Sequence, residues 1–188
     1  MPVPKNPATD SPSPTRREVI AGVSAGIGTL AVSSADAAVP SPDGISRAAE
    51  SIHQEVMLKA EPRRVYAVLT DPAQFQKLVL LSGAMASGMI KATPIAQISA
   101  EAGGAFAIFG GHVYGRMIEL VPQERIVQAW RPADWAAGVF SIVRFELVAA
   151  GQGTRLVFDH TGFPQGQADH LAAGWKANYW EPLAKVIA

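Results

Sequence analysis

The residue whose type and position best suit acid–base chemistry is His160, at the end of a stretch of alternating apolar residues. Leu156 and Phe158 precede it at intervals of two, so the three side chains are expected on one buried face of a β-strand. Because histidine titrates near neutral pH, His160 can serve there as a general acid or base, or donate to a ligand carbonyl. The alternative is a structural histidine whose ring is hydrogen-bonded to loop backbone. The sequence leaves both open.

Other polar residues also stand in apolar surroundings. His112 and Tyr114 are two positions apart, so within one strand they share a face. Facing inward they would form a polar end to a cavity, and facing outward they would belong to the surface. The preceding Gly110-Gly111 permits a β-bulge, so parity alone does not choose between these two placements. Asn178 lies within an apolar stripe and needs a partner if buried, either a ligand or a backbone carbonyl.

Several kinds of chemistry find little support in the sequence. The chain has no cysteine, and its four histidines are widely separated without an i, i+4 pair, which is unlike a metal site. These histidines are His53, His112, His160 and His170. No serine stands in a Gly-x-Ser-x-Gly setting, and no glycine-rich segment ends in Gly-Lys-Ser/Thr. The 16 basic and 16 acidic residues balance without forming a basic block. We therefore predict no cofactor, no metal and no nucleic-acid partner.

The final stretch, residues 167–188, is predicted to be the long helix beside which these polar residues lie. Its large apolar side chains recur every three to four positions and form one stripe. The stripe consists of Leu171, Trp175, Tyr179, Leu183 and Val186, with Pro182 and Ile187 beside it. A lone helix of this length is marginal in water, so it must lie against a large apolar surface.

The residues before this helix predict a sheet with one buried face. Ile52 to Leu58 alternates as a first strand, and helices are predicted to start at Pro62 and at Pro72, the latter capped by Asp71. Later strands are predicted at residues 105–109, 112–121, 126–131, 139–148 and 154–161. This order indicates an α+β domain whose antiparallel sheet is covered by helices on one side only.

Spaced motifs in this region resemble a known family. The motifs are FGGHVYG at residues 109–115, LVP at 120–122, IVQAWR at 126–131, Trp135, GWK at 174–176 and YW at 179–180. Their order resembles the carboxy-terminal domain of the activator of heat-shock protein 90 ATPase, a branch of the START-like (SRPBCC, helix-grip) superfamily, over roughly Ile52 to Ile187. The resemblance implies a curved antiparallel sheet of about six or seven strands wrapped around the long carboxy-terminal helix, with two short helices after the first strand.

Members of this superfamily often hold an apolar ligand between sheet and helix, so the resemblance makes the inward-facing residues candidates for ligand binding. By strand parity and helix phase these are Tyr66, Leu78, Phe106, Ile108, Trp130, Phe145, Phe158, His160, Trp175 and Tyr179. The alternative is that all of them simply fill the core, as aromatic residues mostly do. Three functions follow: an exported module that binds a small hydrophobic or amphipathic molecule, a protein-interaction module like the co-chaperone activator, and a cyclase- or hydratase-type enzyme using His160.

The first 37 residues predict an export signal. A Pro- and Ser-rich leader, expected to be disordered, precedes Arg16-Arg17, an uncharged stretch from Val19 to Val32, and the small-residue site Ala35-Asp36-Ala37. The paired arginines indicate the twin-arginine route and a periplasmic or otherwise exported protein, with a linker at 38–51 and the domain at 52–188. The apolar run is about 14 residues, whereas a membrane span needs roughly 20. No stable membrane span is expected in the mature protein.

Overall fold

The computed structural model describes residues 50–92 and 94–188. The predicted export signal, with Arg16, Arg17, Ala35 and Ala37, lies outside the described residues, as does nearly all of the predicted linker. The first strand begins one residue earlier than predicted, at Ser51.

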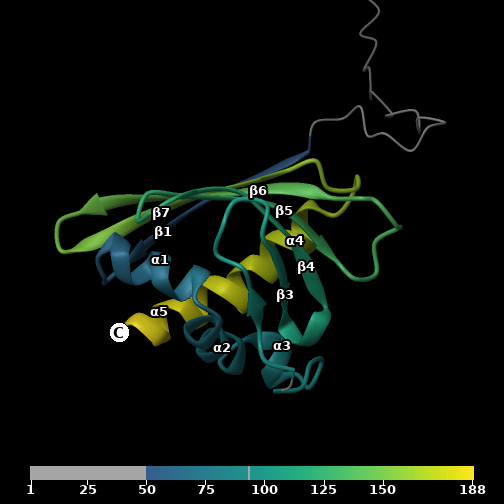
Figure 1. Ribbon diagram of the computed structural model, residues 1–188, viewed down its shortest axis with the longest axis horizontal. Helices are drawn as coiled ribbons and strands as arrows, with labels where there is room; N and C mark the ends of the chain where they lie inside the picture. The colour runs from purple at the N-terminus through teal and green to yellow at the C-terminus, as the bar shows by residue number, and fades with distance from the viewer. Residues whose placement is uncertain (1–49, 93) are drawn as a thin grey trace, which may run out of the picture. The chain divides into compact units, whose positions relative to one another are not determined.

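One antiparallel sheet of seven strands forms the frame of the domain, in the order β1-β7-β6-β5-β4-β3-β2 (Figure 1). The strands are β1 Ser51–Leu58, β2 Gln97–Ile98, β3 Ala105–Ile108, β4 Val113–Val121, β5 Arg125–Pro132, β6 Ser141–Ala150 and β7 Gly153–Thr161. Consecutive strands from β2 to β7 are neighbours, and β1 pairs with β7 along its whole length. Among these seven strands, the sequence prediction missed only β2, which is two residues long and therefore shows no alternation of apolar and polar residues.

Three short helices connect β1 to the rest of the sheet: α1 Pro62–Thr70, α2 Pro72–Leu80 and α3 Gly83–Ala86. The predicted cap of α2 is confirmed, because the Asp71 carboxylate accepts the backbone N–H of Gln74 at 2.8 Å. The sequence did not predict α3. Ser82 caps this helix, since its hydroxyl accepts the N–H of Met85.

The carboxy-terminal helix crosses the inner face of the sheet, as predicted (Figure 1). It is continuous but changes its hydrogen bonding, with α4 Ala168–Trp175, a π-helical turn at Lys176–Trp180 and α5 Glu181–Ile187. The Glu181 N–H reaches back five residues to the Lys176 carbonyl. Pro182 has no N–H to donate to the carbonyl four residues earlier, which gives the wider turn a local cause. The extra residue turns Trp180 inward, so the buried stripe includes a tryptophan that regular helical spacing did not predict.

The two faces of the sheet differ as the alternating sequence predicted. In β6, Val143, Phe145 and Leu147 are buried beneath the helix, whereas the alternate residues Ile142 and Arg144 are exposed. The fold prediction is therefore confirmed: an α+β domain in which a curved antiparallel sheet covers a long carboxy-terminal helix. No helix among the described residues is long and apolar enough to cross a membrane.

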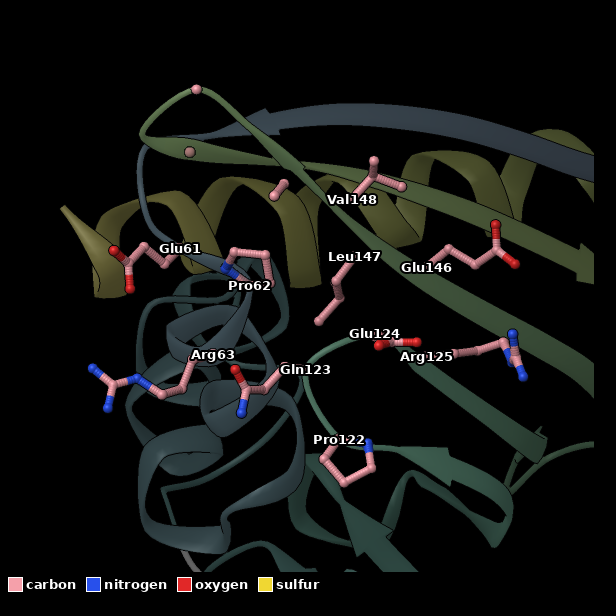
Figure 2. A pocket seen from close by; sticks show the side chains of 13 residues that line it. Glu61, Pro62, Arg63, Pro122, Gln123, Glu124, Arg125, Glu146, Leu147 and Val148 are labelled. Carbon is pink, nitrogen blue, oxygen red and sulfur yellow. The ribbon is translucent and has the colours of Figure 1, made fainter.

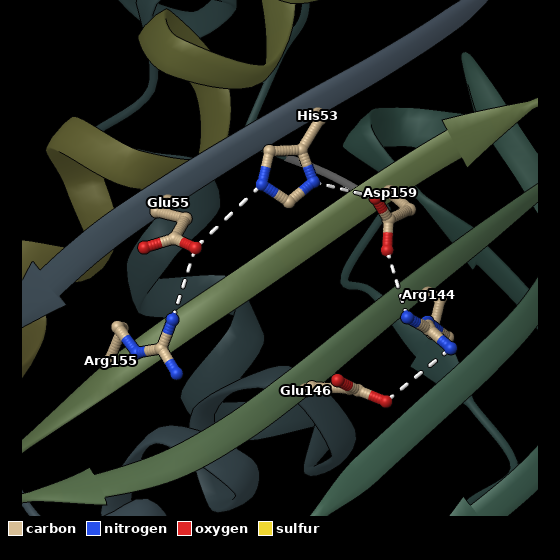
Figure 3. Close-up of polar contacts among 6 residues, drawn as sticks. All are labelled: His53, Glu55, Arg144, Glu146, Arg155 and Asp159. Atoms are coloured by element: carbon tan, nitrogen blue, oxygen red, sulfur yellow. Dashed lines mark hydrogen bonds and ion pairs between the residues drawn. The ribbon is translucent and has the colours of Figure 1, made fainter.

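The outward face of the sheet carries a ladder of alternating charges across β1, β7 and β6 (Figure 3). His53 on β1 lies 2.8 Å from the Asp159 carboxylate on β7, and Arg144 on β6 contacts the other oxygen of Asp159 at 3.1 Å. Beside them Arg155 pairs with Glu55 at 3.1 Å. These groups are exposed, except for the half-buried Asp159, so each pair contributes little to stability.

Candidate functional site

A pocket of about 310 Å³ opens where β5 ends, beside the helix formed by α4 and the π turn. Its walls come from the end of β5, the turn before β4, the segment around α3, and the helix. The lining residues are Ala84, Met89, Ile90, Phe109, His112, Val113, Trp130, Pro132, Ala133, Asp134, His170, Leu171, Gly174, Trp175, Asn178 and Tyr179. Its volume and its mostly apolar wall, which includes the rings of Phe109, Trp130, Trp175 and Tyr179, are typical of small-molecule sites.

Two residues that line the pocket carry a polar atom that is buried without a hydrogen-bond partner among the described residues: Trp130 Nε1 and Tyr179 Oη. The two side chains are only 5% and 4% exposed. Buried polar groups are nearly always hydrogen-bonded, because leaving one unpaired costs about 1–3 kcal/mol. Each of the two atoms has less than 1 Å² of accessible surface, so both belong to the packed core beside the pocket and not to its open surface.

The phenol of Tyr179 remains a hydrogen-bond donor at neutral pH. Burial raises its pKa above the ordinary value, and the nearby Trp130 indole acts weakly in the opposite direction. The indole N–H is thus near the phenol oxygen, although the geometry does not meet hydrogen-bond criteria. Even if that contact tightened, the phenol proton would still need an acceptor.

Asn178, which lines the pocket, forms a hydrogen bond with the backbone of α3. Its side-chain oxygen accepts the backbone N–H of Ala84 at 2.8 Å, so the sequence expectation of a backbone carbonyl as partner is wrong: the partner is an N–H. Gly83 allows this close approach, since an added Cβ would lie 3.2 Å from Ala177 Cβ. With its oxygen engaged, the other end of the Asn178 amide can only donate.

The π turn and the glycine before it shape the pocket floor. Asn178 and Tyr179 belong to the π turn, and Gly174 lies in the preceding turn of α4. A Cβ added to Gly174 would meet no atom within 4 Å, so this position faces open space. Single π turns are frequent at functional sites, because the extra residue redirects side chains.

Phe109 holds an unusual backbone conformation at the same pocket. Its φ is +51°, in the left-handed region that costs a residue with a Cβ about 1–2 kcal/mol. The predicted strand at 105–109 therefore ends at Ile108, and Phe109 begins a 3-10 turn. Edge-on contacts with Phe75 and Tyr179, at centroid distances of 5.7 and 5.3 Å, hold the ring in place.

His160 is buried in a completed hydrogen-bond network rather than at the pocket. Trp175 Nε1–H donates to His160 Nδ1 at 3.0 Å, and Ser141 Oγ donates to the Trp130 carbonyl at 2.9 Å. Because the Ser141 proton is used in that way, its oxygen accepts the Nε2–H of His160 across 2.7 Å. The imidazole is therefore neutral, with both nitrogens engaged.

Burial lowers the pKa of His160 to about 3. A group with that pKa and no free ring nitrogen is poorly suited to acid–base catalysis near neutral pH. The structural role weighed from the sequence is thus the one the geometry favours, although the partners are side chains and not loop backbone.

The structure separates the ten predicted ligand-binding residues into two groups. Trp130, Trp175 and Tyr179 line the pocket. The others lie outside it: Leu78, Phe106, Ile108, Phe145, Phe158 and His160 are buried in the core, and Tyr66 is half-buried on α1. The helix lies so close to the sheet, with Phe158 and Trp175 centroids 4.4 Å apart, that aromatic rings fill most of the space between them.

The rim of the pocket contains residues that sequence reasoning did not join together. His112, Asp134 and His170 lie at its mouth and are exposed. His112 precedes β4 instead of belonging to it, so it shares no strand face with Tyr114, which lies on the outward face near Arg131. Only the fold brings residue 170 beside residue 112, and no local pattern could have shown it.

A second, larger depression of about 850 Å³ lies at the other end of β5. It is an open groove between the start of α1, the β4–β5 turn and the β6–β7 hairpin (Figure 2). Charged side chains of both signs, among them Glu61, Arg63 and Glu146, surround it (Figure 2). Arg125 is already paired with Glu119 at 2.8 Å. Because this groove is open and its lining mixes charged residues with apolar ones such as Leu147 and Val148, the smaller and mostly apolar pocket is the better candidate site.

Comparison with known proteins agrees with this architecture. The family model "Activator of Hsp90 ATPase homolog 1-like protein" matches residues 59–188. Activator of 90 kDa heat shock protein ATPase homolog 1 of Homo sapiens is 30% identical over 92 residues, 49% of this chain and 27% of that protein. The Dictyostelium discoideum homolog is 35% identical over 79 residues, 42% of this chain and 21% of that protein. These alignments span about a quarter of the relatives' length or less.

Solved structures show the same fold. An HSP90 activator from Plasmodium falciparum superimposes with a TM-score of 0.63 at 21% identity, over 72% of this chain and 94% of the other. CalU16 from Micromonospora echinospora gives 0.58 at 21% identity, over 74% and 77%. The fold is thus the START-like (SRPBCC) helix grip, and with a family model that matches most of its length, the chain belongs to the family of Activator of Hsp90 ATPase homolog 1-like proteins.

Proposed function

We propose that this protein is a binding module that holds a small, mostly apolar molecule in the pocket beside its carboxy-terminal helix. The observation that carries the proposal is the pocket itself, about 310 Å³ in volume, whose wall is mostly apolar and includes the rings of Trp130, Trp175 and Tyr179. An apolar cleft with a few polar groups is the usual form of a small-molecule site. The proposed ligand lies at one end of the helix, since core side chains occupy the middle.

Filling the pocket tests this proposal directly. Gly174→Leu places a side chain in the open space next to Trp175, and it should abolish binding of 1-anilinonaphthalene-8-sulfonate or naphthalene, measured by fluorescence. Ala173→Leu is the matched control, because residue 173 is exposed on the same helix. Native mass spectrometry of the purified protein should detect a copurified small molecule. Equal probe binding by the wild type and the Gly174→Leu variant would overturn the proposal.

A second candidate function is protein interaction, favoured by the names of the relatives and by an exposed apolar segment. Leu80 and Leu81 at the end of α2, with Met89 and Ile95 further on, are 46–68% exposed. The relatives are called activators of a heat-shock protein ATPase. If this chain acts likewise, it should raise the ATPase rate of purified heat-shock protein 90. Leu80→Asp/Leu81→Asp should remove that effect, whereas Met57→Asp, on the outward sheet face, should not.

We also propose that the protein is exported by the twin-arginine route. The support is the sequence itself, in which Arg16-Arg17, an uncharged stretch and Ala35-Asp36-Ala37 follow one another in the order of an export signal. Replacement of Arg16-Arg17 by two lysines should retain the protein inside the cell. Unchanged location in fractionated cells would contradict this route.

A further inference from the structure

β1 is a long strand with a neighbour on one side only. It has eight residues and lies at one edge of the sheet, whereas β2 at the other edge has two. Among the described residues, no backbone group of β1 bonds to backbone outside the sheet. An open strand edge is a template on which another strand can pair. The free side of β1 is therefore a candidate interaction surface.

The alternation of the sheet shows which residues of β1 face this free side. The Leu147 N–H bonds to the Glu124 carbonyl beside the start of β5, so odd-numbered residues of β6 bond towards β5 and even-numbered ones towards β7. Carried through the registers of β6 with β7 and of β7 with β1, this alternation directs the backbone of Gln54 towards β7. The N–H and C=O groups of His53 and Glu55 therefore point to the free edge.

The side chains of β1 are complementary to a second copy of the same strand. His53 and Glu55 are exposed on the outer face of the sheet (Figure 3), and Ile52 and Val56 face inward. In an antiparallel pair of two β1 strands with a two-fold axis at Gln54, His53 of each copy lies opposite Glu55 of the other. On the inner side, Ile52 of each copy then lies opposite Val56 of the other.

Neighbouring registers of the two strands are less favourable. An axis at Glu55 would bring two carboxylates together, and an axis at His53 would bring two imidazoles together. An axis between two residues would pair outward with inward side chains and so invert one sheet relative to the other. The hydrogen bond with Asp159 also raises the pKa of His53, which favours the cation that faces Glu55. Charge thus selects the axis at Gln54.

We propose that two copies of this chain pair through the free edges of their β1 strands, about a two-fold axis at Gln54, and join their sheets into one. At each pairing of His53 with Glu55 the strands exchange two backbone hydrogen bonds, and the side chains add an ion pair. A single pair of strands buries less than the roughly 1,200–2,000 Å² of a stable interface, so the dimer is reversible, with a Kd on the order of tens of micromolar. No residue of β1 lines the pocket, so this pairing is independent of the proposed ligand.

Sedimentation velocity of the full chain, from about 1 µM to about 1 mM, measures this equilibrium and should show the wild type passing from monomer to dimer. Glu55→Pro removes an N–H from the free edge but none that bonds to β7, so it should keep the protein monomeric. Glu55→Gln retains that N–H and should weaken the dimer by about tenfold or less. Circular dichroism checks that both variants are folded.

An exchange of charges tests the register. His53→Glu places two carboxylates opposite each other, and Glu55→Arg places a guanidinium opposite an imidazole, so each variant alone should be monomeric. An equimolar mixture of the two should form a heterodimer, because opposite charges then meet in both pairs. Glu146→Arg is the control, since β6 lies two strands from the free edge, and this variant should dimerise like the wild type.

The outcomes decide between this edge and other surfaces. A wild type that stays monomeric at about 1 mM would overturn the proposal, since it is well above the expected Kd. A dimer that survives Glu55→Pro would place the interface elsewhere. If the wild type dimerises but the mixed charge variants do not, the axis at Gln54 is wrong. The charge variants decide alone if Glu55→Pro does not fold.

Discussion

Burial of a neutral imidazole at His160 couples the stability of the domain to pH. Its pKa is about 3 in the folded protein, against about 6.5 in the unfolded chain. Below pH 6.5 the unfolded state therefore binds a proton that the folded state does not. Stability should fall by up to about 1.4 kcal/mol for each pH unit below about 6, and this group should add no slope above pH 7.

Chemical denaturation at pH 7, 6 and 5 measures this slope, since Asp and Glu side chains remain largely ionised in that window. His160→Gln is the comparison, because its amide nitrogen can still donate to Ser141 but does not titrate. The variant should be less stable at pH 7 and should lose less stability on acidification. Parallel pH profiles for the two proteins would show that His160 is not the group responsible.

Gly174 lowers the stability of α4, and its place at the pocket explains why a residue without a side chain stands there. Glycine in a helix interior is less favourable than alanine by about 1 kcal/mol. Because a Cβ at Gly174 would meet no atom within 4 Å, Gly174→Ala should raise the free energy of unfolding by up to that amount. Denaturant midpoints check it. Gly115→Ala should do the reverse, because its Cβ would lie 1.9 Å from the Ala129 carbonyl oxygen.

The pairing of β1 with β7 can be followed through the pKa of His53, which lies on β1 beside Asp159 on β7. The hydrogen bond to Asp159 raises the pKa of His53, and the same bond lowers the pKa of the Asp159 carboxyl. The His53 contribution to stability is thus present below its unfolded pKa and is lost as pH rises through the raised folded value. Asp159→Asn should bring the pKa of His53, followed by NMR titration, back toward 6.5. An unchanged titration would mean that the pair does not form in solution.

Much of the fold follows from local patterns in the sequence. The alternation in β6 and β7, the Asp71-Pro72 helix start and the stripe from Leu171 to Leu183 each identified an element and its buried face. The irregular features escaped because their causes are not periodic. The strand before Phe109 ends because the φ of this residue is positive. The π turn forms where Pro182 has no N–H to make the usual helical hydrogen bond.

The pocket was harder to predict than the fold. Strand parity shows which side chains point inward, but it cannot tell a cavity wall from a filled core, because that depends on how closely the helix approaches the sheet. Trp130 and Phe158 both point inward, yet only Trp130 reaches the pocket. The rim depends on contacts between distant segments, as His112 and His170 show.

The pairing of the first strand with the last has a consequence for how the chain acquires its structure. His53 and Asp159 are 106 positions apart, so β1 has no strand to pair with until nearly all of the domain has left the ribosome. Contacts this distant in sequence are slow to form, because the loop between them must close before they stabilise anything. Until β1 has paired, β7 is an edge strand, and its unpaired side and the aromatic residues of the core are exposed to solvent and to other chains. If the protein follows the proposed twin-arginine route, which carries folded proteins, β1 must pair with β7 before export can begin.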